Sequence, residues 1–361
     1  MSLAWALDRR SILKLGLAGA CVALRDVVRV RKASAQAGRP AIDPRERHLG
    51  SLRQLTFGGQ NAEAYFDRAG ARLVFQSTRP PFDCDQIFTM RDDGSEARLV
   101  STGRGRTTCA FFTPDGRRLI YASTHLGGDA CPPPPDRSSR YVWPIYPTYD
   151  IFGAAADGSH PVRLTDNDGY DAEGAIGPDG RIVFTSLRQG DLDLYSMEGD
   201  GRNVRRLTDE PGYDGGAFYS WDGRMIVFRA HRPRTRDDLE EYRALLARSL
   251  VRPRALELYL MRADGTGLRQ VTRNGAANFA PFLHPNGQHI VFASNLHEPG
   301  GGSFALYVIN VDGSGLERIT YAETFASFPM FSPDGRRLVF SSSRGAASPR
   351  DLNVFIADWA A

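Results

Sequence analysis

The stretch Phe331-Ser332-Pro333-Asp334-Gly335-Arg336-Arg337-Leu338-Val339-Phe340-Ser341-Ser342 decides the fold of this chain. A Pro-Asp-Gly turn lies between two apolar, β-prone runs, and Asp-Gly between such runs is the strongest short-range signal for a β-hairpin. The same pattern recurs upstream, with turn glycines at Gly116, Gly180, Gly223 and Gly287 and a weaker copy at Gly70. The sequence therefore contains six copies of one hairpin.

A second hairpin follows each of the first five copies. Its turn is an Asp-Gly pair at positions 93–94, 157–158, 200–201, 264–265 and 312–313. A strand with an Arg-Leu-Thr-like sequence, such as Arg163-Leu164-Thr165, then ends the unit. Each unit has four strands, which we call a, b, c and d in chain order. Repeats of about 40–50 residues with four strands each are typical of β-propeller blades.

The sixth unit ends after its third strand, near residues 353–356. A stretch that matches the d pattern, Leu52-Arg53-Gln54-Leu55-Thr56, precedes the first unit. We therefore predict an all-β fold, a six-bladed β-propeller over residues 51–359. The N-terminal strand completes the last blade, so that no sheet edge is left open where the ring closes.

Several motifs of the repeat resemble a known family. Ser332-Pro333-Asp334-Gly335, the later Ser342-Ser343-Arg344, the Asp193-Leu194-Tyr195 strand and the Arg-Leu-Thr endings are similar to the WD40-like (PD40) repeats of TolB-like six-bladed propellers. The resemblance covers about residues 50–359 and implies the fold, whereas propellers host many unrelated activities. TolB carries an α/β domain before its propeller, and we expect that domain to be missing here.

The first 37 residues resemble a twin-arginine export signal. Arg9-Arg10 precede an apolar run over residues 15–24, which is too short to span a membrane, and Ala35-Gln36-Ala37 offers a small-x-small cleavage site. We predict a signal at residues 1–37, a linker at 38–50, and a periplasmic or otherwise extracytoplasmic location without a transmembrane span after processing. An arginine-rich cytosolic N-terminus is the alternative.

The composition is that of an ordinary soluble domain. The chain has 361 residues, of which 42% are hydrophobic and 24% charged, and its formal net charge is +3. Basic residues crowd the first 47 positions, so the ring itself is close to neutral. It lacks the concentrated basic stripe of a nucleic-acid-binding protein. We expect a monomer with no nucleic-acid partner.

Three cysteines remain in the predicted mature chain, Cys84, Cys109 and Cys131, and repeat arithmetic places them on one side of the ring. Export predicts an oxidising compartment, where disulfides persist. We predict one disulfide, either Cys84–Cys109 or Cys109–Cys131, with the third thiol free or buried. Three buried thiols are the alternative, because spacing does not fix connectivity.

Two blades carry long insertions between strands b and c. They run over about residues 125–148 in blade 2 and 232–255 in blade 4. The b–c loops and the d-to-a connections share one face of the ring, which we call the upper face. Because loops on a rigid scaffold tend to carry function, we expect the two insertions to wall a groove over blade 3.

The two insertions differ in character. The blade 4 insertion predicts a short helix with Thr235 as N-cap and Leu239 and Tyr242 at helical spacing, either a lid or a helix packed on the rim. The blade 2 insertion follows His125 and has four consecutive prolines. Its aromatic residues either stack on a sugar or peptide or pin the loop to the ring. The ligand-binding candidates of this insertion are His125, Arg137, Tyr141 and Trp143.

Polar residues recur at two positions of strand a, where the channel opens on the upper face. Nine residues before the hairpin glycine stand Asn61, Asp171, Asp214 and Asn278, and seven before it stand Glu63 and Glu173. All six are ligand-binding candidates, because gathered carboxylates need a cation or a basic ligand among them. Asp171, Glu173 and Asp214 are the candidate ligands of calcium or another divalent cation. The alternative is that each aspartate caps its own turn.

A basic residue follows strand b in five blades. In this repeat family such an arginine resembles a structural partner for the acid of strand c, here Asp85, Asp150, Asp193 and Glu257. A basic ring around an anionic ligand is the alternative. The basic residues are Arg79, His125, Arg188, Arg232 and Arg344.

The sequence favours a binding role over an enzyme. It contains no Gly-x-Ser-x-Gly nucleophile elbow, phosphate-binding loop or dinucleotide fingerprint. We predict an exported envelope module that holds an envelope protein or a polysaccharide on its upper face. The alternative is a metal-assisted lyase or hydrolase that acts on a polysaccharide at the channel mouth, and a third interpretation is a cation-stabilised ring without substrate.

Overall fold

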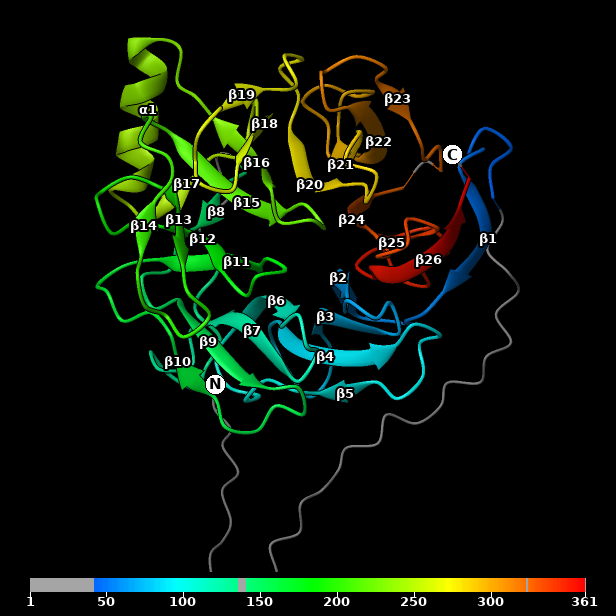
Figure 1. Ribbon diagram of the computed structural model, residues 1–361, viewed down its shortest axis with the longest axis horizontal. Coiled ribbons are helices and arrows are strands. Elements are labelled where there is room, and N and C mark those ends of the chain that lie inside the picture. Colours follow the sequence, from blue (N-terminus) through cyan, green and yellow to red (C-terminus); the bar gives the residue numbers. More distant parts are fainter. Residues whose placement is uncertain (1–41, 136–140, 323, 361) are drawn as a thin grey trace, which may run out of the picture. The chain divides into compact units, whose positions relative to one another are not determined.

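A computed structural model describes residues 42–135, 141–322 and 324–360, and these residues form a ring of six four-stranded antiparallel sheets (Figure 1). The fold is therefore the all-β, six-bladed propeller that the repeats predict. The predicted export signal and Arg137 lie outside the described residues. Within these ranges no helix is long and apolar enough to cross a membrane.

Each blade has its shortest strand outermost, except for the last blade. The inner strands are β2 (Gln60–Phe66), β6 (Thr107–Phe112), β11 (Asp171–Ile176), β15 (Tyr213–Tyr219), β20 (Asn278–Leu283) and β24 (Ala326–Phe331). The second strands are β3 (Arg72–Thr78), β7 (Arg118–Ser123), β12 (Ile182–Ser186), β16 (Met225–His231), β21 (His289–Ser294) and β25 (Arg337–Ser342). The third strands are β4 (Gln86–Arg91), β9 (Asp150–Ala155), β13 (Asp193–Met197), β18 (Glu257–Arg262), β22 (Ala305–Asn310) and β26 (Asn353–Trp359). The outer strands are β5 (Arg98–Leu99), β10 (Val162–Arg163), β14 (Arg205–Arg206), β19 (Arg269–Gln270), β23 (Glu317–Arg318) and, in the last blade, β1 (Leu49–Gln54).

One backbone hydrogen bond recurs between every pair of neighbouring blades. The N–H of a residue at the start of the inner strand donates to a carbonyl at the start of strand c of the preceding blade, at 2.8–3.1 Å. In the last junction, Asn61 of the first blade donates to Leu352 of the sixth at 2.8 Å. Because these bonds join the start of each inner strand to the preceding blade, they also fix the positions of the polar residues at the strand starts.

The N-terminal strand belongs to the last blade. Figure 1 shows β1 (blue) along β26 (red), and the two pair antiparallel from Leu49↔Trp359 to Gln54↔Phe355. Thr56, directly after β1, accepts a hydrogen bond from the N–H of Val354 through its side-chain oxygen at 2.9 Å. The threonines of the Arg-Leu-Thr motifs make the same bond in four other blades, which explains why the motif recurs: Thr165, Thr208, Thr272 and Thr320.

The segment before β1 also packs on the ring. Glu46 is buried and forms an ion pair with Arg344 through two hydrogen bonds, of 3.0 and 2.9 Å. The backbone N–H of Tyr321 donates to the same carboxylate at 2.8 Å. Residues 46–54 thus contact the last blade at two places, at its upper side through Glu46 and at its outer edge through β1.

A second, smaller hydrophobic cluster lies above blades 2 to 4. The blade 2 insertion contributes β8 (Trp143–Pro144), which pairs with β17 (Leu250–Val251) of the blade 4 insertion. The blade 4 insertion also contains α1 (Arg236–Leu246), where the side chain of Thr235 accepts from the N–H of Asp238 as the N-cap. Buried members of the cluster include Ile145, Tyr149, Tyr170, Leu192, Tyr242 and Val251. The insertions therefore form a packed roof over blade 3. The prediction of a groove at this place is wrong, because side chains fill the space.

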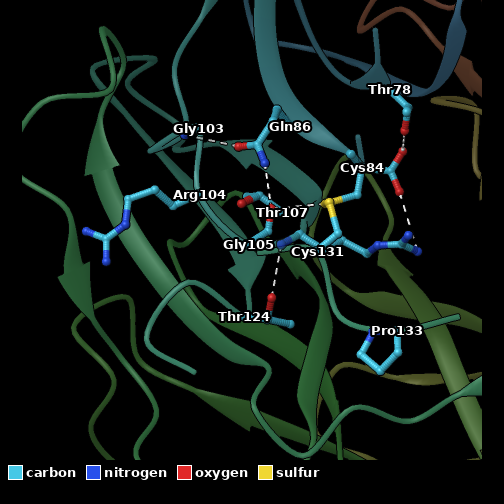
Figure 2. Close-up of a disulfide and its surroundings, with 12 residues drawn as sticks. Thr78, Cys84, Gln86, Gly103, Arg104, Gly105, Thr107, Thr124, Cys131 and Pro133 are labelled. Carbon is cyan, nitrogen blue, oxygen red and sulfur yellow. Dashed lines mark hydrogen bonds and ion pairs between the residues drawn. A yellow bond between two sulfur atoms is a disulfide. The ribbon is translucent and has the colours of Figure 1, made fainter. Parts of the chain in front are cut away.

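The predicted disulfide exists, but both predicted pairings are wrong. Cys84 bonds to Cys131, with Cα atoms 5.9 Å apart (Figure 2). Among the described residues, Cys109 is the free thiol. Cys109 lies on the inner strand β6 and lines the channel, whereas Cys84 precedes β4 on the upper side, where the loop that carries Cys131 can reach it. The bond attaches the proline-rich segment of the blade 2 insertion to blade 1.

Candidate functional site

Every inner strand contains a β-bulge at the same position. The ladder to the second strand shifts register there in all six blades, and the bulged residue has a left-handed φ of 43–56°. Such bulges re-aim side chains, and non-glycine residues adopt this φ at a cost. The six bulged residues all line the central channel: Glu63, Cys109, Glu173, Gly216, Ala280 and Phe328. The position seven before the hairpin glycine is therefore the one that reaches the channel.

Glu173 is the most fully bound of these channel residues. Its carboxylate pairs with Arg229 at 2.7 Å and accepts hydrogen bonds from the hydroxyls of Tyr213 at 2.9 Å and Thr185 at 2.8 Å. The guanidinium of Arg229 lies 5.4 Å from the ring centre of Trp143 and 5.6 Å from that of Tyr213. Glu173 and Arg229 therefore form an ion pair that additional hydrogen bonds hold in place.

Glu63 has no such partner. Among the described residues its carboxylate forms no ion pair, although Arg229, which is bound to Glu173, lies near enough for its charge to act on Glu63. Burial raises the pKa of Glu63 to about 7, although a hydrogen bond from the Cys109 thiol and the charge of Arg229 oppose the rise. Burial and the neighbouring Glu63 also raise the pKa of the Cys109 thiol well above its usual value. At neutral pH the channel therefore holds a thiol and a half-protonated carboxyl side by side.

The channel is filled toward the lower face. The rings of Tyr65, Phe111 and Phe218 pack with centres 4.6, 5.4 and 5.7 Å apart. Below them, the guanidinium of Arg68 lies 5.5 Å from the ring centre of Trp221. The cavities at this level have volumes of only about 40 and 50 Å³. A ligand of more than a few atoms can therefore reach Glu63 only from the upper face.

A cavity of about 980 Å³ opens on the upper face. Glu63, Glu173 and Arg229 line it at the channel end, and Arg252 and Arg254 line it beside α1. Its apolar wall is a chain of rings with centre distances of 5.4, 4.7 and 5.7 Å, which we call the aromatic arc: Trp143, Phe279, Phe304 and Phe325. The cavity, which we call the funnel, thus lies beside the roof and extends over blades 5 and 6.

The candidates at the other predicted position do not reach the funnel. Asn61, Asp171, Asp214 and Asn278 all have no exposed surface. The side-chain amide of Asn278 donates to the carbonyl of Leu256 at 2.7 Å, and that of Asn61 donates to the carbonyl of Leu352 at 2.9 Å. The two asparagine side chains therefore hold neighbouring blades together.

The candidate metal ligands are not brought together. Asp171 pairs with Arg188 at 3.0 Å, Asp214 pairs with Arg232 at 2.9 Å, and only Glu173 lines the channel. Burial raises the pKa of Asp214 to about 7 against the effect of Arg232. Within the described ranges no group of three or more His, Cys, Asp or Glu side chains could hold a metal ion. Two of the three proposed ligands are instead neutralised by arginines.

The same contacts correct the expectation for the arginines after strand b. Arg188 and Arg232 pair with acids of strand a, and the acids of strand c pair elsewhere. Asp150 pairs with Arg163 at 2.8 Å and Asp193 with Arg206 at 2.6 Å, both from strand d. The arginines after strand b are structural, as expected, but the predicted partner is wrong because the strand c acid faces outward along the blade.

The remaining candidates separate into two groups. Trp143 and Tyr141 line the funnel, and the Tyr141 side chain is 58% exposed. His125 is buried against Phe152, with ring centres 4.3 Å apart, and burial lowers its pKa. His125 therefore packs in blade 2 and does not line the funnel.

Sequence reasoning missed most of the funnel wall. Arg229 occupies an interior position of strand b, and Phe304 and Phe325 precede strands c and a of two different blades. Phe328 stands at the channel position of blade 6, so the repeat predicts that it lines the channel. Its ring is not an oxygen ligand, and it is therefore absent from the predicted site. The aromatic residues at the strand starts, which become apparent when the repeats are aligned, are the signal that could have identified the aromatic arc.

The comparisons with known proteins agree with this architecture. Residues 243–354 match the family model of the TolB beta propeller domain, PD40. No curated protein matches the sequence significantly.

Three solved structures illustrate the range of similar folds. A putative TolB from Agrobacterium tumefaciens is 17% identical, with a TM-score of 0.58 over 86% of this chain and 97% of that one. TolB from Acinetobacter baumannii is 18% identical, with a TM-score of 0.54 over 84% of this chain and 64% of that one. Oligogalacturonate lyase from Vibrio parahaemolyticus is 13% identical, with a TM-score of 0.51 over 89% and 96% of the two chains. At these identities the similarity is one of fold.

Proposed function

Because this chain is a TolB-like six-bladed β-propeller, we propose that it is an exported envelope module that binds a segment of a protein partner in the funnel on its upper face. The observation that carries the proposal is the funnel itself. It has a volume of about 980 Å³, a wall of aromatic rings and a floor filled by packed side chains. A concave, mostly apolar site with a few polar groups at its base is the usual form of a binding site.

The aromatic arc suits a polypeptide ligand. Aromatic side chains at the centre of an interface supply much of its binding energy, because they bury large areas with little loss of side-chain freedom. Burying one Leu- or Phe-sized side chain against such a wall is worth about 1.5–3 kcal/mol. An extended segment with two or three apolar side chains would therefore bind usefully without any rearrangement of the ring.

The metal-assisted lyase or hydrolase is the weaker proposal. It depends on Asp171, Glu173 and Asp214, and two of these carboxylates are bound to arginines in the interior of the blades. The similarity to oligogalacturonate lyase concerns the fold, and function depends on the site. A polysaccharide partner is therefore one of the results that a cross-linking experiment would distinguish.

The export route and the monomeric state are part of the proposal. Arg9-Arg10 and the apolar run that follows support transport by the twin-arginine route. The short outer strands, each of which carries arginine, support a monomer, because short and charged edges discourage pairing with another chain.

Photo-crosslinking in cells tests which face binds. A photoreactive phenylalanine analogue would replace Gly302, where an added side chain meets no atom within 4 Å, and separately Ala255, which is exposed at the funnel edge. The matched control position is Arg224, in an exposed turn of the lower face. We expect a discrete protein adduct from both funnel positions and none from the control.

Other outcomes of this experiment decide against the proposal. Adducts that form only at the control position would move the binding surface to the lower face. Adducts at the funnel positions that are sensitive to glycan-degrading enzymes and resistant to protease would assign a polysaccharide ligand instead of a protein.

A further inference from the structure

Of the charged groups that the structure describes at the funnel base, Glu63 is the one that forms no ion pair. It lines both the funnel and the narrower channel below it, at the point where the two meet. The other carboxylate at this level, Glu173, is paired with Arg229 at 2.7 Å. The remaining channel residues at the same ring position are a thiol, two small residues and a phenylalanine. In the part of the chain that the structure describes, the base of the funnel therefore has one acidic group without an ion pair.

The rest of the funnel does not supply the missing cation. Arg252 is bound to Glu241 at 3.2 Å, and Arg254 is bound to Asp238 at 3.0 Å and to Glu241 at 2.7 Å, so both are engaged with α1. Arg229 is held between the rings of Trp143 and Tyr213 as well as by Glu173. A carboxylate that is shielded from water and forms no ion pair is costly in its charged form, and a cation from outside would offset that cost.

We propose that the funnel takes a basic side chain of the partner polypeptide, with its ammonium or guanidinium group against the Glu63 carboxylate and its methylene stem against Phe328. This inference rests on the proposed function, because it names the anchor residue of the bound segment. Lysine and arginine combine a long apolar stem with a terminal charge, and this matches a cavity with an aromatic wall and an acid at its base. Apolar neighbours of the basic residue would lie on the aromatic arc.

The geometry argues against the other ligand types. Among the described residues, a metal ion would find one carboxylate without an ion pair at this level, Glu63, since Glu173 is bound to Arg229 and accepts several hydrogen bonds. An anionic ligand would be drawn toward Arg252 and Arg254 at the edge of the funnel and repelled at its base. Of these ligand types, a basic side chain is the one that uses both the acid and the aromatic wall of the cavity.

Selection from a peptide library tests the anchor. The purified protein and its Glu63→Gln variant would be screened in parallel against a random library of N-acetylated, C-amidated heptapeptides. We expect the unmodified protein to enrich lysine or arginine at one fixed position, flanked by apolar or aromatic residues. We expect Glu63→Gln to lose that enrichment, with at least a tenfold weaker affinity for the selected peptide. Glu317→Gln, on the outer rim, is the matched control and should select the same peptides.

Proton release on binding gives a second readout. The groups that face Glu63 are Cys109 on β6, Glu173 on β11, Arg229 on β16, Tyr65 on its own strand and Asp85 beside β4. A bound cation favours ionised Glu63, so the peptide should displace roughly half a proton at pH 7. Calorimetry in two buffers with different ionisation enthalpies measures this number, which should fall to zero in Glu63→Gln.

The possible results separate this inference from the proposed function. Selected peptides without a fixed basic residue, basic residues equally enriched by Glu63→Gln, or binding without proton release would overturn the anchor and leave peptide binding standing. Failure of the unmodified protein to select any peptide would overturn both.

Discussion

Replacing Glu46 with alanine is expected to lower the free energy of unfolding by about 3–5 kcal/mol. The side chain of Glu46 is fully buried and that of its partner Arg344 is 5% exposed, so the variant leaves a guanidinium charge buried without a counter-ion. The backbone N–H of Tyr321 also loses its acceptor. Because residues 46–54 join the N-terminal strand to the last blade, the loss acts on the closure of the ring. Urea unfolding followed by tryptophan fluorescence measures the change.

A neighbouring acid provides the matched control. Glu317 pairs with Arg47, one residue after Glu46, at 2.6 Å, but the Arg47 side chain is 73% exposed. Exposed ion pairs contribute little, so Glu317→Ala should change the free energy of unfolding by less than about 1 kcal/mol. Equal effects of the two substitutions would show that the Glu46–Arg344 pair does not stabilise the closure of the ring.

Replacing Glu63 with glutamine is expected to stabilise the protein above pH 7. The folded-state pKa of Glu63 is about 7, against an ordinary value of 4.5, so the folded protein holds this proton more tightly than the unfolded chain does. The stability that this proton contributes is lost as the pH rises through 7. Glutamine cannot ionise, so the variant should gain about 1–3 kcal/mol at pH 8 and be nearly equal to the unmodified protein at pH 5.

The comparison must be made as a difference between the two proteins over pH 5–8. Asp214, with its pKa also raised to about 7, adds a pH dependence of the same sign, and this contribution cancels in the difference. A constant difference across this range would mean that Glu63 is not protonated in the folded protein. A stabilising substitution at a funnel residue would indicate that the acid is kept at the expense of stability, as is common at functional sites.

The fold could be predicted from the sequence because the same local signals occur six times. Each Pro-Asp-Gly-type turn specifies one hairpin, and the d pattern at residues 52–56 identifies the strand that completes the last blade. The start of α1 could be predicted from Thr235 because N-capping is also a local signal, which depends on residues three positions apart. Local chemistry of this kind is readable without knowing what packs against it.

Only part of the site could be predicted from the sequence. Two positions of strand a carry similar polar residues, but their side chains face different ways in the structure. The bulge turns Glu63 and Glu173 into the channel, whereas Asp171 and Asp214, two residues before a channel position, are buried and pair with arginines of their own blades. Alternation along a regular strand would have kept both sets on one face, and a bulge breaks that rule. The pairing of charges across blades could not be read from single repeats.

The insertions illustrate a second limit. The sequence placed both loops on the upper face, but β8 and β17 pair with each other, and the space over blade 3 is filled. The same long-range packing brings Cys131 to Cys84, which neither predicted pairing included. Contacts between distant loops depend on their three-dimensional course, which spacing does not determine.

The most direct test of binding through the funnel is the affinity of the cross-linked partner for two single-residue variants. Trp143→Ala removes the ring that covers Arg229 and begins the aromatic arc, whereas Val162→Ala changes an outer-rim residue that is 50% exposed. We predict at least a tenfold rise in Kd for Trp143→Ala, about 1.4 kcal/mol or more, and no change for Val162→Ala. Undiminished affinity in a Trp143→Ala protein with an unchanged circular dichroism spectrum would contradict binding in the funnel.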